Sequence, residues 1–125
     1  IEHAPSRMIA RTYIAKARAI AGQDKTALET ASGIEKTDMR NKAYGAIAEA
    51  QARAGRINAL RTSLDKINDP GYRNRQRKTT ARMLAENGHM HAAYQTADAI
   101  TGNATLKAKA LHILLEAHKT KNRTD

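Results

Sequence analysis

"AIAEAQARAGRINALRTSLDKINDP", residues 46–70, contains two apolar patterns separated by a glycine. An alanine-rich run ends at Gly55. Leu60, Leu64 and Ile67 then follow at spacings of i, i+4 and i+7, which place them on one side of an α-helix. Glycine suits the left-handed conformation that often ends a helix, and proline in the first turn of a helix loses no hydrogen bond. The stretch therefore predicts a helix, a tight turn, a second helix and the start of a third at the closing proline.

The same pattern occurs three times along the chain. Gly22, Gly55 and Gly88 are 33 residues apart, and each closes an alanine-rich run. Apolar residues recur at fixed distances after each glycine, as Ala27, Ala31 and Ile34, as Leu60, Leu64 and Ile67, and as Ala93, Ala97 and Ile100. The helix before each glycine repeats as well, with Ile14, Ile47 and Ile113 at one position and Thr80 as the exception. Such repetition is typical of arrays of helical hairpins.

The boundaries between these patterns predict seven helices with short connections. Asp69, Asp38 and Asn103 are the expected N-caps, because a short polar side chain there accepts a hydrogen bond from the first turn. The expected helices span 6–21, 25–35, 38–54, 57–67, 70–87, 90–100 and 104–119. We expect one all-α domain over residues 1–120, followed by a polar tail at residues 121–125.

The composition agrees with a helical fold. The chain has 125 residues, 41% of them hydrophobic, without Phe or Trp and with four Tyr. Small apolar side chains bury little area each, so they need closely packed helices, and alanine is the best helix former. Without cysteine, disulfides are excluded. No stretch approaches the roughly 18 apolar residues of a membrane span, and no apolar signal segment opens the chain, which favours a cytoplasmic location only slightly.

The alternating helices, the turn glycine and the small residues at packing positions resemble tetratricopeptide repeats. "AIAEAQARAG" (46–55) and "ALRTSLDKI" (59–67) match best. The resemblance implies a right-handed α-solenoid of antiparallel helix pairs with a 33-residue repeat. It also implies a non-enzymatic scaffold that binds an acidic or extended protein segment on a concave face.

In such repeats the first helix of each pair lines the concave face. The resemblance then assigns to this face Thr12, Tyr13, Lys16, Lys42, Glu49, Arg53, Arg75, Lys78, Arg82, His112 and Lys119. From these we expect a binding set of Tyr13, Lys16, Lys42, Arg53, Arg75, Lys78 and Arg82. Glu49 is expected to neutralise a neighbour such as Lys42 or Arg53.

The stretch "PGYRNRQRKTTARML" (70–84) holds five basic side chains and no acidic one. Helical geometry divides them, because Arg75, Lys78 and Arg82 share one side of a helix while Arg73 and Arg77 lie on another. Arginine recurs at 33-residue intervals as Arg7, Arg40 and Arg73, which indicates a structural role. We expect these arginines to pair with acids of the preceding short helix, such as Glu35 or Asp65.

Other function classes find less support. The net charge of +10 would attract nucleic acid to the same face, but the four tyrosines needed for stacking lie on separate helices. No nucleophile with a base, no pair of catalytic acids and no phosphate-binding glycine loop is recognisable, so we expect no enzyme and no cofactor. The histidines do not converge, so no metal site is expected. A helical accessory domain of a larger enzyme is a further alternative.

The last helix contains the most apolar run, "ALHILLEA" (110–117). If no further helix covers it, Ile113, Leu114 and Leu115 should stay partly exposed. Exposed apolar patches mark contact sites. The run therefore predicts self-association through residues 110–117, docking of another domain, or further sequence that belongs on this end. A membrane-surface role is disfavoured because alanine-rich stripes anchor poorly.

Overall fold

The computed structural model describes residues 3–122, and within them it contains α-helices and no strand. The helices are α1 (His3–Ile20), α2 (Asp24–Ser32), α3 (Thr37–Ala54), α4 (Ile57–Asp65), α5 (Pro70–Glu86), α6 (Met90–Asp98) and α7 (Ala104–Asn122). The predicted all-α class and every predicted helix are confirmed. Helix α7 continues to Asn122, so the first residues assigned to the polar tail are helical, and residues 123–125 lie outside the described part.

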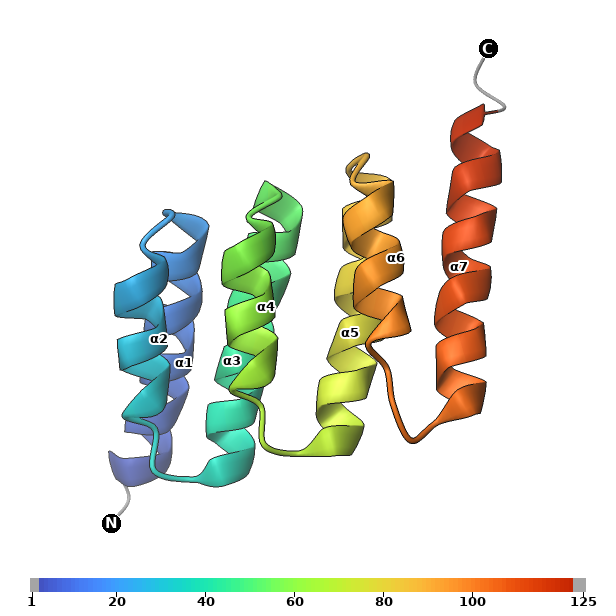
Figure 1. The fold of residues 1–125 in the computed structure, drawn as a ribbon. Helices are drawn as coiled ribbons and strands as arrows, with labels where there is room; N and C mark the ends of the chain where they lie inside the picture. Colours follow the sequence, from blue (N-terminus) through green and yellow to red (C-terminus); the bar gives the residue numbers. More distant parts are fainter. Residues whose placement is uncertain (1–2, 123–125) are drawn as a thin grey trace.

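The helices form two layers (Figure 1). The long helices α1, α3, α5 and α7 stand in a row, and each packs on the next. The short helices α2, α4 and α6 cover one side of this row, each against the long helix that precedes it in the chain. The largest fully buried apolar side chains come from the long helices, from α4 and from the connections that follow the short helices: Ile34, Ile47, Leu60, Ile67, Leu84, Ile100 and Leu114.

Glycines allow the tight turns and one close helix approach. Gly22, Gly55 and Gly88 have φ angles of +84°, +74° and +88°, so the predicted left-handed glycines are confirmed. Gly45 serves a different purpose inside α3, because a Cβ added there would collide with the Gln76 amide and the Tyr72 hydroxyl of α5. This glycine lets α3 and α5 approach closely.

Two of the three predicted N-caps are confirmed. The Asp69 carboxylate accepts from the backbone N–H groups of Gly71 and Tyr72 at 3.0 and 3.2 Å, and the Asn103 side-chain oxygen accepts from Leu106 N–H at 2.9 Å. The prediction for Asp38 is wrong, because α3 begins one residue earlier. Asp38 therefore lies in the first turn, where a negative charge favours the helix dipole.

The short helices α2 and α4 end earlier than predicted. Their last turns tighten, since Ile34 N–H donates to Ala31 O and Ile67 N–H donates to Leu64 O, both three residues back. The carbonyls left free at these ends are bound by arginines of the next long helix. Arg40 Nη1 donates to Ile34 O at 2.9 Å and Arg73 Nη1 donates to Ile67 O at 2.7 Å. Ile34 and Ile67 lie two residues beyond the ends of α2 and α4, so these guanidinium groups fasten the connection after each short helix to the next long helix.

The expected pairing of Arg40 and Arg73 with Glu35 or Asp65 is thus corrected. Arg40 contacts Glu35 through the backbone oxygen at 3.4 Å, and neither arginine bonds a carboxylate: Arg40 binds two main-chain carbonyls and the Thr37 hydroxyl, and Arg73 binds the Ile67 carbonyl. A planar guanidinium offers several donors at once, which suits it to the unpaired carbonyls at a helix end. These arginines have a structural role, but by a different contact from the one expected.

Candidate functional site

The seven predicted binding residues all lie on the long helices, and none lies on a short helix. Six of them are exposed and Lys78 is half-buried: Tyr13 and Lys16 on α1, Lys42 and Arg53 on α3, and Arg75, Lys78 and Arg82 on α5. We call the surface formed by these residues, with His112 and Lys109 of α7, the long-helix face. Tyr13 and Lys16 lie apart on α1, and the other five residues form three separate groups and not one continuous patch.

The first group is offset by acids. Arg53 lies 4.0 Å from the Glu49 carboxylate and Arg82 lies 3.8 Å from that of Glu86. The expectation that Glu49 neutralises Arg53 is confirmed. Exposed ion pairs of this kind contribute little stability. They do reduce the positive charge available to a partner.

The second group lies around a hollow of about 140 Å³ between α3 and α5. Lys42 and Arg75 line this hollow together with Asp38 and Asp69. The Arg75 guanidinium also lies over the Tyr72 ring, 5.7 Å from its centre. Two cations and two carboxylates balance here, so this hollow offers no excess charge for an anionic ligand. Tyr13 and Lys16 lie on α1, at the other end of the row from Lys78.

The third group forms an open groove of about 630 Å³ between α5 and α7. It is lined by Lys78, Ala104, Thr105, Ala108, Lys109, His112 and Ile113. No acid lines it. Within the side chains that the structure describes, neither Lys78 nor Lys109 has an ion pair. The groove therefore combines an apolar floor with two unneutralised ammonium groups and an imidazole.

Two lysines at repeat positions that are packed elsewhere explain why a groove lies between α5 and α7. Lys78 occupies the position on α5 that Gly45 occupies on α3, 33 residues earlier. Lys109 occupies the position of Ala43 and Gln76, which are buried between the long helices. Burying two unpaired ammonium groups would cost several kcal/mol. Because lysines occupy these positions, α5 and α7 leave a gap in which both ammonium groups stay in contact with water.

Lys109 is the groove residue that the sequence reading missed. The sequence does contain a signal for this residue, because the 33-residue repeat aligns Lys109 with Ala43 and Gln76, which lie between the preceding long helices. A lysine at such a position indicates an open interface. His112 was expected on this face and lines the groove. Lys119 instead pairs with Glu116 at 3.6 Å.

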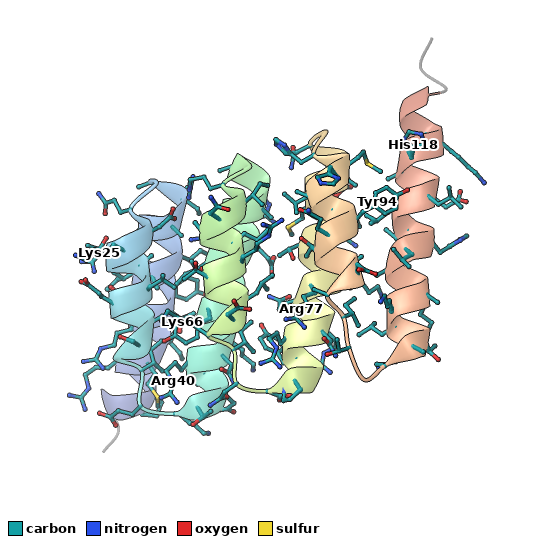
Figure 2. All side chains as sticks on the ribbon, in the orientation of Figure 1. Lys25, Arg40, Lys66, Arg77, Tyr94 and His118 are labelled. Atoms are coloured by element: carbon teal, nitrogen blue, oxygen red, sulfur yellow. The ribbon has the colours of Figure 1, made fainter. Side chains whose placement is uncertain are left out.

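Arg73 and Arg77 do not belong to the long-helix face, as helical geometry predicted. Arg77 Nη1 donates to Ala99 O at 3.0 Å and to the Asn74 side-chain oxygen at 3.1 Å, which closes the end of α6 (Figure 2). Burial lowers the pKa of Arg77, and the nearby Arg73 lowers it further, while Asp65 opposes the shift. Both arginines hold the fold together.

The apolar run of α7 is less exposed than expected. Leu114 is fully buried, so its predicted exposure is wrong, and Ile113 is half-buried at the groove. Helix α6 packs on α7 and covers the Leu114 side. Leu115 is 44% exposed, as predicted.

Two other kinds of site were sought in the described residues. No group of three or more His, Cys, Asp or Glu side chains there is arranged to hold a metal ion. None of the described helices is long and apolar enough to cross a membrane.

No protein-family model, curated protein or solved structure matched the chain. The groove and the charges around it are therefore the features that bear on its function.

The buried Tyr44 and the half-buried Tyr72 predict a loss of stability in alkali. Burial raises the pKa of Tyr72 above the ordinary 10.0, and the charge of Glu49 raises it further, while the charge of Arg75 lowers it. Burial also raises the pKa of Tyr44, while the charge of Arg40 lowers it. The unfolded chain then releases these protons first, so the free energy of unfolding should fall as the pH rises above 10.0. Urea unfolding from pH 9 upward measures this, and Tyr72→Phe should give a shallower fall. An unchanged slope in Tyr72→Phe and Tyr44→Phe would contradict the prediction.

Proposed function

We propose that the chain is a right-handed, tetratricopeptide-like α-solenoid with a 33-residue repeat. Contacts that recur at this interval support the proposal. Asn41 bonds Asn68 after the following short helix, and Asn74 bonds Thr101 O at the matching place. The arginine bonds to Ile34 O and Ile67 O recur in the same way. In such a solenoid the long-helix face is concave.

The chain acts, in this proposal, as a non-enzymatic scaffold that binds an acidic segment of a protein partner. The α5–α7 groove carries the proposal, because Lys78 and Lys109 flank an apolar floor and have no acidic partner. A carboxylate between them would accept charge-assisted hydrogen bonds. A neighbouring apolar side chain of the partner would lie on Ala104, Ala108 and Ile113. The groove thus fits a segment in which acidic and apolar residues alternate.

Arg75 and Arg82 extend this site along α5. They share one side of the helix with Lys78, and both are exposed. An extended partner segment leaving the groove would pass these guanidinium groups, where its carboxylates would compete with Glu86 for Arg82 and with the acids of the α3–α5 hollow for Arg75. Lys42, Arg53, Lys16 and Tyr13 would contact more distant parts of the same partner.

Nucleic acid is the alternative ligand for the same face. The structure reduces the aromatic surface available for it, because Tyr44 is buried and Tyr72 is half-buried beneath Arg75. Tyr94 lies on α6, in the other layer (Figure 2). Single-strand binding relies on stacking platforms, so the arrangement favours an acidic peptide.

Binding of a labelled peptide that alternates glutamate and leucine tests the proposal. Combining Lys78→Glu with Lys109→Glu should weaken binding by roughly 100-fold at low salt, since two attractive contacts become repulsive. Fluorescence anisotropy measures the affinity, and circular dichroism checks that the helices persist.

The matched control combines Lys25→Glu with Lys66→Glu. These exposed lysines belong to α2 and to the end of α4, in the short-helix layer, and their reversal changes the net charge equally (Figure 2). The control should lose less than about threefold in affinity. An equal loss in both variants would mean that overall charge, and not the groove, attracts the peptide. Tighter binding of a single-stranded oligonucleotide, weakened by the same groove variant, would favour the nucleic-acid alternative.

A further inference from the structure

The large exposed apolar side chains of the described residues gather at the two ends of the helix row. Ile9, Tyr13, Ile14 and Ile20 of α1 are 49%, 69%, 45% and 64% exposed. Ile14 stands at the repeat position of the buried Ile47, whereas the other three stand at positions of the long-helix face and border this side. At the other end, Tyr94 of α6 and Leu115 of α7 are 40% and 44% exposed. The middle helices expose none of this kind. We infer that the α1 end of one molecule packs on the α6–α7 end of a second copy, which continues the row from molecule to molecule.

The α1 end carries the same residues that bury α3 against α1. Ala10, Ile14 and Ala17 stand 33 residues before Ala43, Ile47 and Ala50. The latter three are buried, and α3 packs on α1. Ala10, Ile14 and Ala17 are exposed. The free side of α1 therefore presents an interface that the molecule already uses internally, and it fits a long helix of the same kind.

Side-chain volumes indicate that this helix is α7 of a second copy. In the internal contact, Gly45 of α3 faces the large side chains of Gln76 and Tyr72 of α5. The equivalent of Gly45 on α7 is Leu111, and the equivalents of Gln76 and Tyr72 on α1 are Ala10 and Ser6. Inside the molecule, a small residue on α3 faces two large side chains on α5. Between molecules, the large Leu111 would face two small side chains on α1. The two ends are thus complementary in shape at this position.

A second position agrees with this arrangement. Glu49 of α3 accepts a hydrogen bond from Gln76 of α5 at 3.1 Å, so the two positions face each other. Their equivalents at the free ends are Leu115 and Ala10, both apolar. The polar contact inside the molecule is replaced by an apolar one between molecules. This replacement explains why Leu115 is exposed in the single chain.

The short helices fit the same scheme. Arg61 of α4 donates to the side-chain oxygen of Gln95 of α6, which shows that this side of α4 faces the next short helix. Tyr94 stands at the equivalent place on α6, which is the last short helix of the described residues. The equivalent of Gln95 on α2 is Glu29, which is exposed. In the assembly, the Tyr94 hydroxyl would donate to the Glu29 carboxylate of the second copy.

Such a contact is heterologous, because two different surfaces meet, and it produces open chains of molecules. The contact is also mainly apolar, and it joins two molecules that each carry a net charge of +10. Salt screens the repulsion between like-charged molecules and leaves apolar burial intact. Association should therefore strengthen as salt rises, whereas binding of an acidic peptide to the groove should weaken. The two proposals can then fail independently, although both use the proposed 33-residue register.

Sedimentation equilibrium of the whole chain tests the inference. The average mass should rise above 13.7 kDa with protein concentration, and more so at high salt. Ile14→Gln alters only the α1 end and Leu115→Gln only the α7 end, and each alone should weaken association at least tenfold. Both side chains are exposed, so the fold should persist, and Ala54→Gln on the exposed end of α3 is the matched control.

Mixing the two variants decides the geometry. Each retains the end that the other lacks, so an equal mixture should form dimers of twice the chain mass that grow no further. If Leu115→Gln alone still dimerises fully while Ile14→Gln does not, two α1 faces pair with each other and the inference is wrong. A wild-type chain that stays monomeric at high concentration and high salt would also overturn it.

Discussion

Replacing Ile47 with alanine is expected to lower the free energy of unfolding by about 3 kcal/mol, because the substitution leaves a cavity in a closely packed site. Ile47 is fully buried, and it lies on α3 where that helix packs on α1. The neighbouring residues on this side are alanines, whose short side chains cannot move to fill the space. Urea unfolding followed by circular dichroism measures the change.

The chain contains its own control for this prediction. Ile14 stands at the same repeat position, flanked by the same alanines, but its side chain is 45% exposed. In dilute solution, Ile14→Ala should cost less than about 1 kcal/mol, since little cavity forms. Equal losses at the two positions would mean that Ile14 is buried, and the description of the α1 end would then need revision.

Replacing Gln51 with leucine is expected to destabilise the protein by about 2 to 3 kcal/mol. The Gln51 side chain is fully buried, donates to Asp24 at 3.0 Å and accepts from the Ser63 hydroxyl at 2.7 Å. Leucine has a similar volume but removes both bonds. The buried Ser63 hydroxyl would then lose its partner. Arg56 would still hold Asp24 through two bonds of 3.0 and 3.1 Å. Thermal and urea unfolding measure the loss.

The third hairpin shows how this loss can be reversed. There Leu84 occupies the position of Gln51 and Thr96 that of Ser63, and the Thr96 hydroxyl donates to Ala92 O in its own helix at 2.8 Å. Adding Ser63→Thr to Gln51→Leu should therefore restore more than half of the lost stability, because threonine can bond the carbonyl four residues earlier. If the double variant is as unstable as the single one, the lost stability comes instead from the missing hydrogen bond between Gln51 and Asp24.

The helices were predictable because each repeat carries its own boundary signals. Gly22, Gly55 and Gly88 mark turns by a local conformation, and Asp69 before Pro70 marks a helix start by a local hydrogen bond. Such signals act within a few residues, so a single sequence contains them. The ends of the short helices were less predictable, because their carbonyls are bound by Arg40 and Arg73 from the next helix.

The groove was harder to predict because it depends on two helices at once. Helical geometry put Lys78 on one side of α5 with Arg75 and Arg82, but the groove that Lys78 lines also needs Lys109, which belongs to α7. Only the pair shows that the two helices separate. Arg77 likewise finds its partner at Ala99, 22 residues away. Helical geometry separates Arg77 from Lys78 on α5. It does not give their distant partners, Ala99 and Lys109, because these depend on how the helices pack on one another.

The main packing contacts of this molecule join only neighbouring helices in the row, and none of them closes the row on itself. Its cooperativity is therefore transmitted step by step, and one end of the row can melt while the other end stays folded. Pulling on the two termini would strip hairpins away one after another, so the chain would respond to force as a spring with a few discrete extensions.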